Sequence, residues 1–345
     1  MVASKKIECS VVCPLYNEET LISQNFSKLY NLLEAQFNDS FELILVNDGS
    51  KDDSINRLLK SIKDEKINKG RVRVFSYDYN QGRGRALKTG IDNANGNIIV
   101  TTESDMSWGK SIISELYKKL DDDPQLHFVI ASPHLKKGSF KNVPLGRRLL
   151  SKYGNKLIKT FFIKEISMNT GMTRAYRSEV IKPLLVERDG KDFHLEVLLK
   201  LLGLGFKYAE IPATLSWPEK DQNKSNVGAK RKSSTNILNT IFSHLTFIVY
   251  ARPIKQFALI TASTFLMATI FLGLSLKALY DGDEHIFHLG ISILLYLGTV
   301  MFAAFCIQFF QTRDLLRSIW MANYAMPHPP SRVTGECIYD SLGSK

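Results

Sequence analysis

Two long runs without a charged side chain stand close together in the last third of the sequence, at residues 257–276 and 286–310. Each run matches the roughly 20 helical residues that the hydrocarbon core of a bilayer requires. Two adjacent runs of this length are rare in a soluble core, so we expect two transmembrane helices. The first two thirds of the sequence mix apolar and charged residues as soluble domains do. The chain therefore divides into a soluble part and a membrane part.

Charge predicts the orientation of the membrane part. The turn at 277–285 is mostly acidic, whereas residues 224–255 carry basic residues and no acid. The positive-inside tendency then predicts that the soluble domain and both termini are cytosolic. We expect a domain at 1–220, a basic linker and interfacial helix at 221–255, a transmembrane hairpin at 256–312 and a cytosolic tail at 313–345. A third span at 236–250 is the alternative to the interfacial helix; the run is short and Pro253 follows it.

Composition narrows the possible partners. The net charge of +11 allows nucleic acid, anionic lipid or a phosphorylated substrate. The basic residues cluster near the membrane part and no nucleic-acid recognition motif is present, so we do not expect nucleic acid as a partner. The 4 cysteines lack CxxC spacing, which argues against a zinc site and a disulfide framework.

Strands and helices alternate along the soluble part. Strand-like runs at 7–15, 41–46, 72–77, 97–102, 127–132 and 207–211 are interspersed with helical patterns at 18–36, 52–66, 85–94 and 192–202. This alternation predicts right-handed βαβ units and a parallel sheet. Ligands of such sheets bind beyond the carboxyl ends of the strands. The polar residues that follow the strands, at 16–18, 48, 80–85 and 103–105, are therefore expected at one rim.

The rim carries four motifs in order: VVCPLYNEE (11–19), LVNDGSKDDS (45–54), NQGRGRALKTGIDNANGNIIV (80–100) and Glu103-Ser104-Asp105. Together they resemble family 2 glycosyltransferases of the GT-A fold. With two C-terminal spans, the chain resembles the polyisoprenyl-phosphate branch, which includes dolichol-phosphate mannose synthases and undecaprenyl-phosphate glucosyltransferases. The resemblance implies an α/β, Rossmann-like GT-A domain with a mostly parallel sheet, followed by interfacial helices and two transmembrane helices.

The resemblance implies a site for a UDP- or GDP-linked sugar donor. The residues expected to bind it are Pro14, Tyr16, Glu18, Asp48, Lys88, Glu103 and Ser104. A carboxylate at a strand end can accept an N–H bond from uracil or guanine, which suits Asp48. The alternatives are local: Asp48 as the cap of the NDGS turn, and Glu18 as an ordinary acid in a first helical turn.

The family's DxD triplet falls on residues 103–105. Oxygen ligands two residues apart at a strand end suit Mg²⁺ or Mn²⁺, which would bridge the donor diphosphate, so Glu103 and Asp105 are the expected metal ligands and catalytic residues. Glu103 replaces the usual Asp, and Ser107 stands where Gln is often found. The alternative is a solvated acidic loop.

The acceptor side is predicted from three further segments. Arg147, counted with the catalytic residues, and Ser151 match an Arg-x-x-x-Ser pattern that binds the lipid phosphate in relatives, and their spacing places both on one helix face. The alternative is a basic face attracted to anionic head groups. Segments similar to the family's D-x-x-G-F-x-x-x-R and Phe-x-x-Glu patterns make Asn169, His194 and Glu196 candidate sugar or acceptor contacts, with packing roles as the alternative.

The expected reaction is inverting, metal-dependent transfer of a sugar from a nucleotide sugar to a polyisoprenyl phosphate. The lipid phosphate is already anionic at pH 7, so no strong general base is needed. One alternative is transfer onto a growing polysaccharide, although the QxxRW signature is absent. Another is an inactive membrane adaptor, because Glu103, Ser107, Pro133 and Asn169 depart from the family pattern together. We expect the membrane as a partner and a homo-oligomer.

Overall fold

The computed structural model describes residues 6–64, 71–143, 148, 166–190, 192–216, 253–325 and 336–340. The chain forms two compact units. The first comprises Met1–Asn236 and Tyr324–Lys345, and the second comprises Ile237–Asn323. The expected boundary at 220 and the expected interfacial helix lie outside the described residues. The last residues of the chain belong to the first unit, where we had expected a separate tail.

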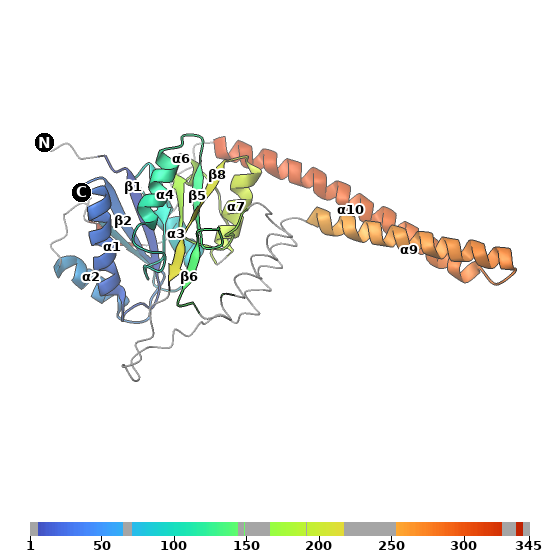
Figure 1. Cartoon of the computed structure of the whole chain (residues 1–345), viewed down its shortest axis with the longest axis horizontal. Helices are drawn as coiled ribbons and strands as arrows, with labels where there is room; N and C mark the ends of the chain where they lie inside the picture. Colours follow the sequence, from blue (N-terminus) through green and yellow to red (C-terminus); the bar gives the residue numbers. More distant parts are fainter. Residues whose placement is uncertain are drawn as a thin grey trace. The chain divides into compact units, whose positions relative to one another are not determined.

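A twisted α/β sheet forms the centre of the first unit (Figure 1). In the described residues its strand order is β10-β3-β2-β1-β4-β7-β5-β8. The strands are β1 (Cys9–Leu15), β2 (Phe41–Asn47), β3 (Val72–Ser76), β4 (Ile98–Thr101), β5 (Phe128–Ser132), β7 (Arg174–Arg177), β8 (Tyr208–Pro212) and β10 (Glu336–Asp340). Only β7 and β10 pair antiparallel to their described neighbours. The prediction of a mostly parallel sheet is confirmed.

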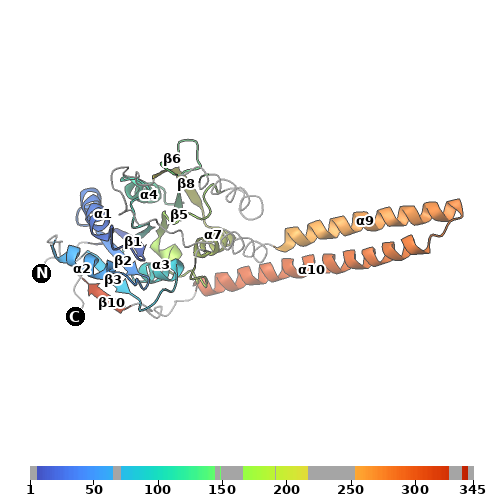
Figure 2. The same ribbon diagram turned by 90° about the horizontal axis from the view of Figure 1, so that it is seen from below.

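Helices cover both faces of this sheet. They are α1 (Ile22–Phe37), α2 (Ser54–Asp64), α3 (Arg83–Asp92), α4 (Ile112–Asp121), α6 (Ser178–Ile181) and α7 (Phe193–Gly203). Figure 2 shows α1 and α4 on one face and α3 on the other. Phe37 of α1 meets Tyr117 of α4 edge to face at 5.1 Å. Gly90 lets α3 approach β1 closely, since a Cβ there would lie 2.2 Å from Val12 Cγ1.

Two short strands, β6 (Ser139–Lys141) and β9 (Thr214–Ser216), pair parallel in a separate small sheet. Their first residues are joined by a hydrogen bond of 2.9 Å between the hydroxyls of Ser139 and Thr214. Ser216 also donates its backbone N–H to Ser107 O at 2.7 Å. The small sheet is thereby tied to the loop that follows β4.

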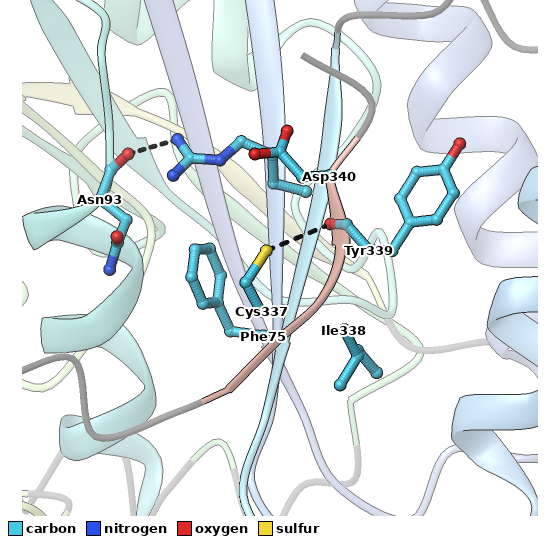
Figure 3. A pocket seen from close by; sticks show the side chains of 7 residues that line it. Phe75, Asn93, Cys337, Ile338, Tyr339 and Asp340 are labelled. Carbon is cyan, nitrogen blue, oxygen red and sulfur yellow. Dashed lines mark hydrogen bonds between the residues drawn. The ribbon is translucent and has the colours of Figure 1, made fainter. Parts of the chain in front are cut away.

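The strand β10 covers the β3 edge of the main sheet (Figure 2). It encloses a shallow hollow of about 400 Å³ against β3 and the end of α3. In Figure 3, Cys337 and Asp340 face this hollow across from Asn93, whose carbonyl accepts a hydrogen bond from Arg73. The hollow lies at the C-terminal end of α3, whereas the expected functional rim is at its N-terminal end.

The second unit is a helical hairpin of α9 (Pro253–Asp281) and α10 (Ile286–Ala325). Both are long and apolar enough to cross a membrane, over Phe257–Asp281 and Ile286–Ala322. The helices contact each other through hydroxyls: Thr299 donates to Thr264 at 3.0 Å, and Ser292 donates to Ala268 O at 2.9 Å. The α10 helix continues well past residue 310, where the uncharged run ends. Arg313, Asp314 and Arg317 are exposed in this extension, and arginine is a good helix former.

Candidate functional site

The turns after β1 and β2 are joined to each other at the rim. Asn17 donates its backbone N–H to Ser50 Oγ at 2.9 Å and accepts the Lys51 N–H on its side-chain oxygen, also at 2.9 Å. Glu18 donates its backbone N–H to Ser54 Oγ at 2.7 Å. Tyr16, in the first of these turns, is 41% exposed. Pro14 is buried in β1 opposite Val46 of β2.

Asp48, at the end of β2, holds the turn that leads into α3. Its carboxylate accepts the backbone N–H groups of Gln81 at 2.7 Å and Gly82 at 3.0 Å, and the Asn80 side-chain amide at 3.0 Å. Burial raises the pKa of Asp48, and these three donors offset part of that rise. Asp48 therefore caps the neighbouring turn, a role that neither sequence-based alternative included. Its contact with a nucleotide base stays a prediction.

A glycine allows the turns after β2 and β3 to touch. Gly49 has φ +63°, a conformation that favours glycine. A Cβ at this position would lie 2.2 Å from the Tyr79 carbonyl carbon. Glycine is therefore required where the NDGS turn passes directly against residues 79–80. This close approach brings the Asn80 side chain within hydrogen-bond distance of the Asp48 carboxylate.

Glu103 and Asp105 follow β4 at the same rim. Glu103 Oε2 accepts the Ser107 hydroxyl at 3.0 Å and the Trp108 ring N–H at 3.3 Å. Its other oxygen lies 3.9 Å from an Arg83 guanidinium nitrogen. Asp105 Oδ1 accepts the backbone N–H of Ser107 at 3.0 Å. Ser104, between the two acids, is 8% exposed.

The carboxylates at the rim influence one another electrostatically. Burial raises the pKa of Glu103, the charge of Asp105 raises it further, and Arg83 with the two hydrogen-bond donors opposes the rise. Burial also raises the pKa of the Cys13 thiol, and the charges of Asp105, Glu18 and Glu103 add to that effect. Because β1 and β4 pair parallel, the turns that carry Glu18, Glu103 and Asp105 follow strand ends at the same edge of the sheet.

The donor set at Glu103 and Asp105 suits a hard divalent cation. Magnesium is commonly bound through one or two carboxylates together with substrate phosphates. The described residues contain no group of three or more His, Cys, Asp or Glu side chains arranged for a metal. A cation there would relieve the repulsion between the two acids and would take its remaining ligands from phosphate and water.

The first two turns of α3 carry basic side chains. Arg83 faces Glu103, and Lys88 Nζ lies 3.4 Å from Asp189 Oδ1. Asp189 also accepts the backbone N–H groups of Gly84 and Arg85 on its carbonyl oxygen, at 2.7 and 3.1 Å. The sequence predicted that residues 80–85, and with them Arg83, lie at the rim, but it gave Arg83 no role. Sequence reasoning missed Asp189, for which the sequence carries no local signal.

The three candidate sugar or acceptor contacts lie in the interior of the first unit. Asn169, His194 and Glu196 are 0%, 1% and 5% exposed. Arg174 links the first two, donating to Asn169 O at 2.7 Å and to His194 O at 3.2 Å. Within the described part of the chain, both His194 ring nitrogens and Asn169 Oδ1 have no hydrogen-bond partner. Burial lowers the pKa of His194 well below its usual value, and the charges of Arg174 and Arg83 add to this.

Arg147 and Ser151, the expected ligands of the lipid phosphate, lie outside the described residues.

The rim motifs lie within a region that is similar to known proteins. The family model described as Glycosyl transferase family 2 matches residues 10–185. The chain belongs to this family. The matched span includes the turns after β1, β2 and β4, so the family resemblance inferred from the motifs is confirmed.

Several curated relatives are similar to this chain. It is 30% identical over 138 residues to an uncharacterized glycosyltransferase, YkcC, of Bacillus subtilis. This match covers 40% of the chain and 41% of the relative. It is 24% identical to an undecaprenyl-phosphate 4-deoxy-4-formamido-L-arabinose transferase of Shewanella sediminis, covering 73% of the chain and 69% of the relative. It is also 24% identical to a dolichol-phosphate mannosyltransferase of Pyrococcus furiosus, covering 63% and 59%. The chain spans about a third to two fifths of the length of the first two curated relatives it matches.

The fold has a solved counterpart. Glucosyl-3-phosphoglycerate synthase of Mycobacterium tuberculosis, in a complex with Mn²⁺, UDP-glucose and phosphoglyceric acid, superposes with a TM-score of 0.50 at 18% identity. The match covers 70% of this chain and 79% of that one. At this identity the likeness establishes the fold alone, and it confirms the expected GT-A architecture.

Proposed function

We propose that this protein transfers a sugar from a UDP- or GDP-linked donor to a polyisoprenyl phosphate, with inversion at the sugar C1 and with a divalent cation. The observation that carries the proposal is the gathering of Asp48, Glu103 and Asp105 at the carboxyl ends of β2 and β4, in a chain that also carries two helices suited to a membrane. The relatives named for undecaprenyl-phosphate and dolichol-phosphate transfer support the acceptor class.

In the proposed mechanism, residues of this chain position two anionic groups: the diphosphate of the sugar donor and the phosphate of the lipid acceptor. Glu103 and Asp105 would hold Mg²⁺ or Mn²⁺, and the cation would stabilise the negative charge of the departing nucleoside diphosphate. Tyr16, Glu18 and Asp48 would contact the nucleotide, and Lys88 and Ser104 would complete the donor site. Arg147 and Ser151 would bind the lipid phosphate.

The chemical step is a direct displacement. A phosphate oxygen of the lipid forms a bond to the sugar C1 while the bond from C1 to the donor diphosphate breaks, so the nucleoside diphosphate leaves with the electron pair. The phosphate monoester enters as an anion, and no proton has to be removed from it. The rate enhancement would come from positioning and from electrostatic stabilisation.

The proposed location follows from the second unit. The helices α9 and α10 would cross the membrane as a hairpin, with the rim and both termini on the cytosolic side because the basic residues 224–255 flank the hairpin there. A long polyprenyl tail could then stay in lipid while its phosphate reaches the rim.

The test is a transfer assay in vesicles that contain the purified full chain and undecaprenyl or dolichyl phosphate. Radiolabelled UDP- and GDP-sugars are supplied with Mg²⁺ or Mn²⁺, and label is followed into the lipid fraction. The proposal expects label in acid-labile lipid with one class of donor, and loss of transfer in EDTA. Donor binding without transfer to either lipid would instead support the inactive adaptor, and label in polymer would support polysaccharide synthesis.

A further inference from the structure

Glu196 lies in the first turn of α7 with both carboxylate oxygens occupied by donors of its own chain. The Glu187 N–H contacts the two oxygens at 3.0 and 3.1 Å, and the Arg188 N–H donates to Oε2 at 2.8 Å. The Lys200 ammonium, one helical turn further on, donates to Oε1 at 2.6 Å. Glu196 is therefore arranged to hold backbone in place.

The backbone that Glu196 holds is residues 185–189, which we call the bracing segment. Lys200 Nζ also donates to Leu185 O at 2.7 Å. The Glu196–Lys200 pair therefore binds the segment both at residue 185 and at residues 187–188. Hydrogen bonds with an ionised partner are roughly twice as strong as neutral ones, and exclusion of water strengthens them further. The bracing segment is thus fixed to α7.

The far end of the bracing segment holds the first turn of α3. Asp189 O accepts the N–H groups of Gly84 and Arg85, and its carboxylate faces Lys88. No free space separates the two parts: a Cβ at Gly82 would lie 2.5 Å from Asp189 O, and one at Gly84 would lie 2.8 Å from Arg188 O. The first turn of α3 is therefore coupled to the position of the bracing segment.

Asp48 binds the neighbouring residues of the same turn, through the N–H groups of Gln81 and Gly82. The turn is therefore held both by a carboxylate at the rim and by the bracing segment. Arg83 begins α3 between Gly82, which donates to Asp48, and Gly84, which donates to Asp189 O, and its guanidinium faces Glu103. A displacement of the bracing segment would change where Arg83 and Lys88 stand relative to the acids at the rim.

We propose that Glu196 is a positioning residue of the donor site. It acts through the bracing segment to set the start of α3, and with it the positions of Arg83 beside Glu103 and of Lys88 beside Asp189. The inference deepens the proposed function and rests on it for the identity of the ligand. It assigns to Glu196 an indirect role in place of the direct sugar or acceptor contact that the sequence suggested.

Glu42 provides a matched control. It is also a buried carboxylate, 0% exposed, and it also holds backbone, accepting the Asn95 N–H together with the Ser10 hydroxyl and Arg73. These partners lie at the amino ends of the strands, away from the rim. Glu42→Gln should therefore lower stability as Glu196→Gln does, without affecting the donor site.

The experiment compares full-length wild type, Glu196→Gln, Lys200→Met and Glu42→Gln in detergent. Amide hydrogen exchange is measured over residues 82–88, and binding of UDP and of GDP is measured with Mn²⁺ by calorimetry below the melting temperature. We expect Glu196→Gln to speed exchange at 82–88 and to weaken nucleotide binding roughly tenfold, since small displacements of positioning groups have effects of this order or larger. Lys200→Met should shift both readouts in the same direction by less, and it tests the inference if Glu196→Gln does not fold.

The outcomes separate this inference from the proposed function. Unchanged exchange at 82–88 in both variants overturns the positioning role whatever the ligand is. Faster exchange with unchanged nucleotide affinity overturns it as well, because the coupling would then not reach the site. An equal loss of affinity in Glu42→Gln would show a general effect of stability and would also count against it. A wild type that binds neither UDP nor GDP contradicts the proposed function, and the donor role of Glu196 fails with it.

Discussion

The two units of this protein place the same apolar residue types in opposite ways. In the first unit large side chains are interior: Phe128 is 0% exposed and stacks between Tyr176 and Tyr208. In the second unit they point outward, as Leu266 does with 61% of its surface exposed. Burial of apolar surface drives folding only where the surrounding solvent is water. The burial pattern of the first unit is that of a domain folded in water, whereas the exposed apolar side chains of the hairpin are what a membrane-spanning hairpin requires.

Polar groups differ between the units as well. The rim brings acidic and basic side chains close together, as at Glu103, Asp105 and Arg83. The hairpin contains neutral hydroxyls that donate to the neighbouring helix or its carbonyls, as between Thr299 and Thr264. Charged side chains are costly in hydrocarbon, whereas hydroxyls can be satisfied there. This contrast agrees with the proposal that sugar transfer takes place in the first unit and that the second anchors the chain in a membrane.

The largest effect is expected at the rim, where loss of one acid should lower sugar transfer. Asp105→Asn should lower sugar transfer by about 10²–10³-fold, the range seen when one group that stabilises developing charge is lost. The fold should be retained, because the backbone N–H of Ser107 can still donate to the amide oxygen. Transfer is measured in vesicles, with Asp64→Asn at the exposed end of α2 as the control. Full activity in Asp105→Asn would refute the metal role.

The next effect tests the comparison of apolar residues directly. Phe128→Ala should destabilise the first unit by about 3–5 kcal/mol, because it removes a buried ring and leaves a cavity. Leu266→Ala should change stability by less than about 0.5 kcal/mol, as substitutions away from packed features do. Thermal unfolding of the full chain in detergent, with circular dichroism as the probe, reports both. Similar losses of stability in the two variants would contradict the placement of apolar side chains in the interior of the first unit and on the outer surface of the hairpin.

A smaller effect concerns pH and His194. The folded-state pKa of this histidine is lowered, so the unfolded chain binds a proton that the folded chain does not. Stability should therefore fall as the pH drops below about 6.5, by up to about 1.4 kcal/mol per pH unit. His194→Gln should remove this component. The measurement is the difference in melting temperature between pH 7.5 and pH 5.5 in the two proteins; an equal difference would show that His194 is not held neutral.

The smallest effect is expected inside the hairpin. Thr299→Val removes the interhelical hydroxyl bond to Thr264 while keeping the shape of the side chain. Interhelical hydrogen bonds in membranes contribute about 0.6 kcal/mol on average, so the change should be near that value. Unfolding of the hairpin in lipid measures it. A loss of several kcal/mol would mean that the hairpin depends on polar contacts as strongly as the rim does.

The local elements of the first unit were predictable because their signals are local. The strands from β1 to β5 and the turns at Asp48 and Glu103 lie within a few residues of their predicted bounds. The helix α4 was missed although Ile112, Leu116 and Leu120 carry its apolar spacing. The strands β7 and β10 were missed for a different reason: each is defined by antiparallel pairing with strands that are distant in the sequence.

The candidate site shows the same limit. Motif order was sufficient to predict that Asp48, Glu103 and Asp105 share a rim. It was not sufficient to predict what Asp48 and Glu196 hold, because their partners lie 33 to 34 and 8 to 9 residues away in turns whose course depends on tertiary packing. The ion pair between Arg83 and Glu103 joins a helix start to a strand end across the rim, and no spacing rule indicates it.

The location of the donor is the central claim, and a cryo-EM map of the full chain in lipid nanodiscs with Mn²⁺ and UDP or GDP tests it most directly. The account predicts density for the nucleotide between Asp48 and the Glu103–Asp105 pair, with the cation beside both acids and the diphosphate near Arg83. Nucleotide density elsewhere, such as in the hollow beside β10, with the rim acids bound to nothing but their own chain, would contradict it.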